Sequence, residues 1–76
     1  MKHIKVEVGQ TVKVKKTLSY KTWGDTFEVK SKGRVGTVAR VEPLDFKGTL
    51  SVLVRFTDNA CDWGNHKDIK LIKDVD

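Results

Sequence analysis

Apolar and polar residues alternate along several short stretches of the chain, which is the pattern of β-strands that bury one face. Residues 11–17 predict a first full strand, preceded by a short lead-in at residues 4–8. The clearest alternation runs over residues 50–56, where each even-numbered side chain is apolar. Extended β-branched residues predict another strand over 37–42, and residues 69–72 predict a final one.

The segments between these strands have the composition of turns and loops. Residues 18–32 predict a long, partly paired first loop, because its aromatic side chains need a place to bury. Pro43 cannot donate a ladder hydrogen bond, so it should end its strand and begin a hairpin connection over 43–48. Residues 57–64 are rich in turn formers, and residues 66–68 predict a short turn before the last strand.

No stretch has sustained helical periodicity, so these elements predict an all-β fold. We expect one domain over residues 1–76, built as a small five-stranded barrel with a long first loop. Closure of the barrel would hide most strand edges. The predicted core is Val12, Val14, Val38, Val41, Leu50, Val52, Val54, Phe56, Ile69 and Leu71.

Charge is unevenly distributed along the chain. The net charge is +5, and residues 1–34 hold nine Lys or Arg against three acids. Such a basic half favours an anionic partner, either an acidic protein surface or a nucleic acid. The alternative is that the lysines keep the protein soluble and protect strand edges from aggregation.

Other features of the composition indicate in which cellular compartment the protein would occur. No apolar run is long enough to span a bilayer, and the N-terminal residues lack the apolar core of a signal peptide. Cys61 is the only cysteine, so an internal disulfide is excluded. We therefore expect a cytoplasmic protein without a membrane partner.

Groups that could perform chemistry are sparse. Cys61, Asp62, His66 and His3 lack the paired spacing of zinc ligands, and no third group is evident that would orient a Cys61–His66 dyad. Asp58 and Asp62 are typical of carboxylates that bond to nearby backbone in turns. The sequence predicts no enzymatic activity, no cofactor, no metal and no small-molecule substrate.

Two glycines precede the strand at 37–42. Gly33 and Gly36 form a G-x-x-G pattern, but the residues after it read as a strand and not as the helix of a phosphate-binding loop. Glycines in this position suit a turn, a bulge or a close approach of two backbones.

The long first loop is the predicted contact surface, since exposed loops on a rigid barrel are where such folds place function. Trp23 stands beside a glycine between Lys21 and Asp25, and tryptophan is common among interface anchors. The alternative for such an aromatic residue is a lid over the core. The predicted partner-binding residues are Tyr20, Lys21, Trp23, Asp25, Phe27, Lys30, Lys32 and Arg34.

In this arrangement the chain resembles an SH3-like barrel, and above all the variable chain of ferredoxin–thioredoxin reductase. The resemblance lies in the opening strand, the end of the long loop, the glycine-marked second strand, the hairpin, the third strand and the closing turn with its strand. These stretches are residues 8–14, 26–30, 33–38, 45–48, 51–56 and 66–71. The related photosystem I barrel subunit is similar over 36–39 and 52–56. The resemblance implies a non-catalytic subunit that supports a partner and helps to dock an acidic electron carrier.

A second resemblance is to KOW-type barrels of transcription and ribosomal proteins, through the turn at residues 33–38 and the basic first half. It implies contact with RNA, DNA or the transcription machinery, as in a small regulator of viral or mobile-element origin. Our first hypothesis is an accessory or regulatory module that docks onto a larger protein. The second is a nucleic-acid-binding barrel.

Overall fold

The protein is all-β in the part of the chain that is described. The computed structural model describes residues 6–19, 25–43 and 50–75. The strands are β1 (Thr11–Val14), β2 (Val35–Pro43), β3 (Leu50–Phe56), β4 (Cys61–Asn65) and β5 (Ile69–Lys73), with two 3-10 helices, η1 (Val29–Ser31) and η2 (His66–Asp68). The predicted all-β class and the number of strands are confirmed.

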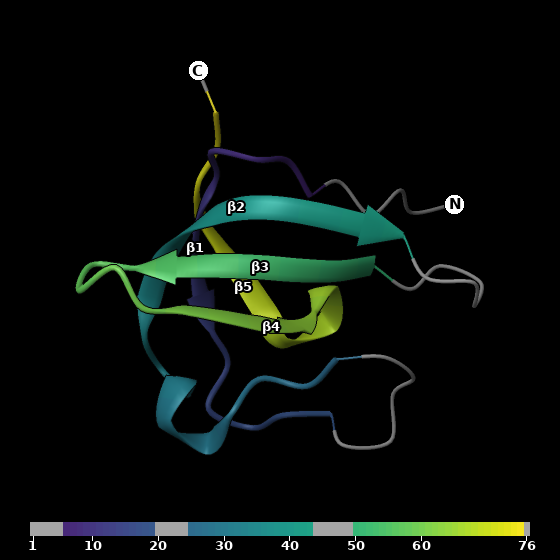
Figure 1. Ribbon diagram of the computed structural model, residues 1–76, viewed down its shortest axis with the longest axis vertical. Helices are drawn as coiled ribbons and strands as arrows, with labels where there is room; N and C mark the ends of the chain where they lie inside the picture. Colours follow the sequence, from purple (N-terminus) through teal and green to yellow (C-terminus); the bar gives the residue numbers. More distant parts are fainter. Residues whose placement is uncertain (1–5, 20–24, 44–49, 76) are drawn as a thin grey trace.

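These strands form a single antiparallel sheet in the order β4-β3-β2-β1-β5 (Figure 1). β4 and β5 are its edges, and within the described residues no backbone pairing joins them, so the predicted closure of the barrel is wrong. η2 forms the turn that connects these two edge strands. Lys67 N–H stabilises this turn by donating to the side chain of Asn65 (2.9 Å).

The sheet is bent along β2. The register between β2 and β3 shifts between Val38 and Arg40, which marks a bulge. The first residues of β2 pair with β1, and the strand as a whole pairs with β3. Figure 1 shows the result: β1 and β5 pass behind β2, β3 and β4. The bend therefore gives the sheet a concave inner side, which the side chains of the core fill.

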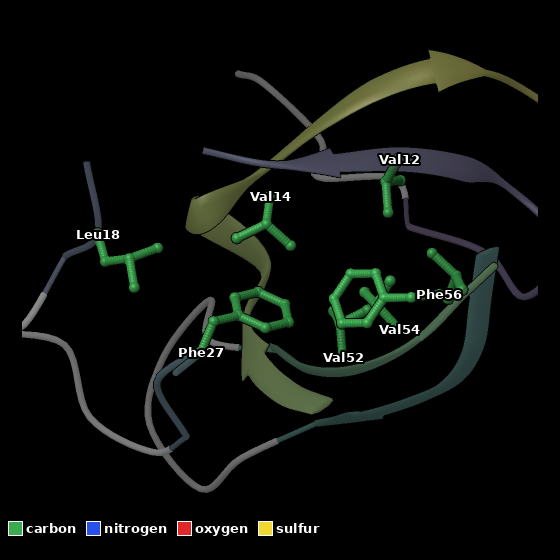
Figure 2. Packing of buried hydrophobic residues seen from close by; sticks show 8 residues of the cluster. Val12, Val14, Leu18, Phe27, Val52, Val54 and Phe56 are labelled. Carbon is green, nitrogen blue, oxygen red and sulfur yellow. The ribbon is translucent and has the colours of Figure 1, made fainter. Parts of the chain in front are cut away.

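The core lies on that inner side and beneath the first loop. Its buried members are Val12, Val14, Leu18, Phe27, Val38, Val52, Val54 and Phe56, and Figure 2 shows the labelled ones pointing toward one another. Six of the predicted core residues are among them. Val41 and Ile69 are partly buried against the cluster, and Leu50 is partly buried. Leu71 was predicted wrongly, because it lies on an edge strand with 49% of its surface exposed.

Several predicted boundaries shift. All of β4 except Asn65 lies in the stretch at 57–64 that was predicted as turn. Its CDWGN sequence does not alternate, and only pairing with β3 makes it a strand. Residues 6–8 belong to no strand, and β1 ends at Val14. Pro43 is the last residue of β2, as predicted. Most of the predicted hairpin connection lies outside the described residues.

Gln10 ties the two described ends of the chain together. Its buried side chain donates through Nε2 to Asp74 Oδ1 (3.0 Å) and accepts from Glu7 N–H through Oε1 (3.0 Å). The backbone beside it joins β2, because Gly9 N–H donates to Val38 C=O and Val38 N–H donates to Gln10 C=O. A buried amide with both ends bonded stabilises the contact between residues far apart in sequence.

Candidate functional site

Of the contact surface predicted for the first loop, the structure describes Asp25, Phe27, Lys30, Lys32 and Arg34. Tyr20, Lys21 and Trp23 lie outside the described residues. Phe27 was predicted as a contact residue and is instead buried in the core, with 2% of its surface exposed. Its ring packs directly against the backbone of Gly64, where an added Cβ would stand 2.1 Å from a ring carbon. The contact prediction for Phe27 is therefore wrong, because its side chain closes the core under the loop.

Aspartates anchor this loop near both of its ends. Ser19 N–H donates to Asp68 Oδ1 (3.0 Å), and Asp25 accepts a hydrogen bond from the buried Ser51 hydroxyl. Asp62 Oδ2 accepts from Glu28 N–H (2.8 Å) and from the Ser31 hydroxyl (2.7 Å).

Two predicted roles change as a result of these bonds. Asp25 is exposed but is engaged in holding the loop to β3. Asp62 was predicted to bond to backbone in its own turn. It bonds instead to Glu28 and Ser31, which are distant in sequence.

Arg34 is held in a clamp on β3 and its turn. Its guanidinium lies 4.3 Å from the centre of the Phe56 ring and pairs through Nη2 with Asp58 Oδ1 (2.9 Å). Asp58 Oδ1 also accepts from Ala60 N–H (3.1 Å), as predicted for a turn carboxylate. The Ala60 N–H, and after it Arg34, hold the pKa of Asp58 below its usual value. The Arg34 side chain thus stabilises the contact with β3 and its turn, through Phe56 and Asp58.

The other two predicted cations differ from Arg34. Lys30, in η1, is exposed and pairs with Glu28 (3.7 Å). Lys32 is partly exposed. The three side chains predicted to form one positive surface are therefore a paired lysine, a half-buried lysine and a clamped arginine.

The strongest unbalanced charge lies on the outer side of the sheet. Lys13 of β1 stands directly opposite Lys70 of β5 and opposite Val35 of β2. In the neighbouring row, Lys73, Thr11, Thr37 and Arg55 follow one another across β5, β1, β2 and β3. Residues opposite each other share a face of the sheet. We call the side chains of Lys13, Arg55, Lys70 and Lys73 the basic face.

These cations have no ion-pair partner in the described part of the chain. Within those residues, no ion pair involves a side chain of the basic face. Aliphatic side chains adjoin these cations, because Val35, opposite Lys13, and Ile72, next to Lys73 in β5, are 43% and 53% exposed. Sequence reasoning placed the positive surface on the first loop. The lysines at 13, 70 and 73 are evident in the sequence, but only strand pairing brings them together.

Cys61 and His66 stand at the two ends of β4. An extended strand separates them by about 16 Å of chain, so the fold does not form the dyad that was considered. His66 is buried, and its Nδ1 accepts from Leu50 N–H (2.9 Å). Burial lowers the pKa of His66 below its usual value. His66 Nε2 and Asp68 Oδ2 are buried without a hydrogen-bond partner.

The basic face is an open surface with positive charge and exposed aliphatic groups. No cluster of three His, Cys, Asp or Glu side chains that could hold a metal occurs among residues 6–19, 25–43 and 50–75. No helix of the described part has the length and apolarity to cross a membrane. No protein-family model, curated protein or solved structure matches this chain.

Proposed function

We propose that this protein is a non-catalytic docking module with an SH3-like fold, which binds an acidic protein surface through its basic face. The long first loop, the bent second strand and the short turn before the last strand support the SH3-like assignment. As an accessory or regulatory subunit, the module would attach to a larger protein or complex.

The observation that carries this proposal is the pair formed by Lys13 and Lys70. Like charges directly opposite each other on neighbouring strands destabilise a sheet by up to ~1 kcal/mol. No acid of the described chain offsets the repulsion. A partner that brings carboxylates to this face would relieve it, and positive charge on one side would also speed the encounter.

The composition of the face favours a protein over a nucleic acid. Val35 and Ile72 give it exposed aliphatic surface, which suits contact with another protein. Binding of single-stranded nucleic acid relies on exposed aromatic side chains among the cations. Of the aromatic residues that the structure describes, Phe27 and Phe56 are buried and Trp63 is partly buried on β4.

The test is affinity capture from a lysate of the source cells, with and without nuclease, using three forms of the protein. Lys13→Glu/Lys70→Glu reverses the face but keeps a like-charged pair, so its cost to the fold is matched. Lys30→Glu/Arg40→Glu changes the net charge equally, at positions already paired with Glu28 and Glu42.

We expect proteins captured by the wild type to survive nuclease, to be lost with the Lys13/Lys70 variant, and to remain with the control. Capture that disappears with nuclease would favour the nucleic-acid hypothesis. Unchanged capture by a folded Lys13/Lys70 variant would contradict the role of the basic face.

A further inference from the structure

β5 is an edge strand of the sheet formed by the described residues. It pairs with β1 on one side only, and no other described strand lies against it. All of its residues except Ile69 are exposed. The opposite edge differs, because Gly64 and Asn65 of β4 are buried. β5 is therefore the accessible edge of the sheet.

The backbone direction shows which groups of β5 face outward. Val14 N–H donates to Arg34 C=O (2.9 Å), and Gly33 N–H donates to Val14 C=O (2.8 Å), so Val14 faces the β2 side. Lys13 must then face β5, since backbone groups alternate along a strand. Lys70 is opposite Lys13 and points back at it. The N–H and C=O groups of Ile69 and Leu71 therefore point away from the sheet.

The side chains of β5 indicate what would suit this edge. Leu71 and Ile72 are 49% and 53% exposed, and Lys70 and Lys73 flank them on either side along the strand. An added strand with acidic and apolar residues in alternation would pair its carboxylates with the lysines and cover the aliphatic groups. A second copy of this chain fits less well, because it would bring two further lysines and a net charge of +5 to the same edge.

We propose that β5 receives an extended acidic segment of the partner as an additional strand. This inference rests on the proposed function and specifies how the partner binds. The ladder would use the outward amides of Ile69 and Leu71, while the carboxylates of the added strand reach Lys70 and Lys13 on the outer face.

The experiment uses two synthetic peptides as long as β5 with the ¹⁵N-labelled protein. One alternates glutamate with valine. The other has the same sequence with every backbone nitrogen methylated, which keeps the charge and removes the ladder donors. At about ten times the Kd of the first peptide, exchange of the Leu71 amide should slow about tenfold, because only the free protein exchanges. The methylated peptide should leave the Leu71 amide unchanged.

The outcomes separate the two proposals. Equal binding of both peptides, lost in Lys13→Glu/Lys70→Glu, would support the basic face and overturn strand addition. No response of the Ile69 and Leu71 amides to the first peptide would overturn strand addition, even where capture from lysate depends on the lysines. Protection of Leu71 that rises with protein concentration alone would overturn it in favour of self-pairing.

Discussion

At the scale of single residues, Phe27 and Gly64 act as a unit. The phenyl ring lies where a side chain at residue 64 would be, with an added Cβ only 2.1 Å from it. The ring therefore covers the β4 backbone and joins the loop to the core. Neither residue can change without affecting the other, because the interior of a small domain is closely packed.

Gly64→Ala should destabilise the fold by about 1–3 kcal/mol, since the methyl group must displace the Phe27 ring. Phe27→Leu in the same chain should cost less than it does alone, because the smaller side chain leaves room for the methyl. Urea unfolding of the two single variants and the double variant measures this coupling. Strictly additive losses would show that the ring and the glycine are independent.

His66 should make the stability depend on pH. Burial lowers its pKa in the folded protein, so the unfolded chain binds the proton first, at about pH 6.5. Its contribution is complete above that pH and is lost as the pH falls from 6.5 toward the folded pKa, by at most about 1.4 kcal/mol per pH unit.

The variant that tests this is His66→Asn, which keeps an acceptor near Leu50 N–H and does not titrate. Urea unfolding at pH 7 and pH 5 should show a smaller difference for the variant than for the wild type. His3→Gln is the control for the other histidine. If the stability of His66→Asn changed between pH 7 and pH 5 as much as that of the wild type, a group other than His66 would cause the pH dependence.

At the scale of elements, the first loop is fixed by side chains from the other end of the chain. Asp62 joins it to β4, Asp68 joins it to η2, and the loop's own Asp25 reaches Ser51 of β3. These bonds replace the backbone ladder that a strand would have. They also leave the carboxylates of this side engaged within the fold.

Asp62→Asn should loosen the end of the loop, because an amide is a weaker acceptor for Glu28 N–H and Ser31 Oγ. We expect a loss of about 1–3 kcal/mol, since bonds to a charged group are among the stronger ones. Hydrogen exchange should accelerate at the Glu28 amide and stay unchanged in β2. Glu42→Gln, at an exposed pair with Arg40, is the control and should have little effect. Uniform acceleration throughout the sheet would mean that Asp62 supports the whole fold.

At the scale of the whole molecule, the acidic side chains bond within the fold more than the lysines of the sheet do. The acids at 28, 42 and 58 pair with cations, and those at 25, 62 and 68 hold the loop. The lysines of β1 and β5 have no such internal partner. Electrostatic strain is thus concentrated on one side of the sheet.

This division predicts opposite effects on stability and binding. Lys70→Glu places a carboxylate opposite Lys13 and should raise the stability by about 0.2–1 kcal/mol, with less gain at high salt. The same change should weaken binding of the acidic partner. Lys30→Glu, which breaks a pair with Glu28, should not stabilise the protein. Urea unfolding at two salt concentrations, beside the capture experiment, measures both effects; a fall in stability would contradict the repulsion between Lys13 and Lys70.

Sequence patterns predicted the strands whose apolar and polar residues alternate. They missed the strand and the exposure that depend on how the strands pair. β3 matches its predicted range because Val52, Val54 and Phe56 alternate into the core, and Pro43 ends β2 for lack of an N–H. β4 was missed because its residues have no alternation of their own. Leu71 has the right spacing for the core, but its position on an edge strand exposes it.

For the basic face, the sequence predicted positive charge but not which residues come together. A basic half was evident from the sequence, and an alternating lysine at 13 should point outward from its strand. Its neighbour at 70 is distant along the chain, so the opposition of the two depends on the register of β1 and β5. Arg34 and Phe27 could not be excluded from a contact surface by sequence, since their clamp and their packing involve β3 and β4.

The bond from Gln10 to Asp74 has a consequence for rearranging the chain. Glu7 and Asp74 both bond to the buried Gln10 side chain, so a short peptide could connect residue 7 to residue 74 without crossing the sheet. New termini could then open in the exposed turn between β3 and β4, at residues 57–60. Such a circular permutant would keep every strand neighbour, and β5 would become an internal segment of the chain while remaining at the edge of the sheet.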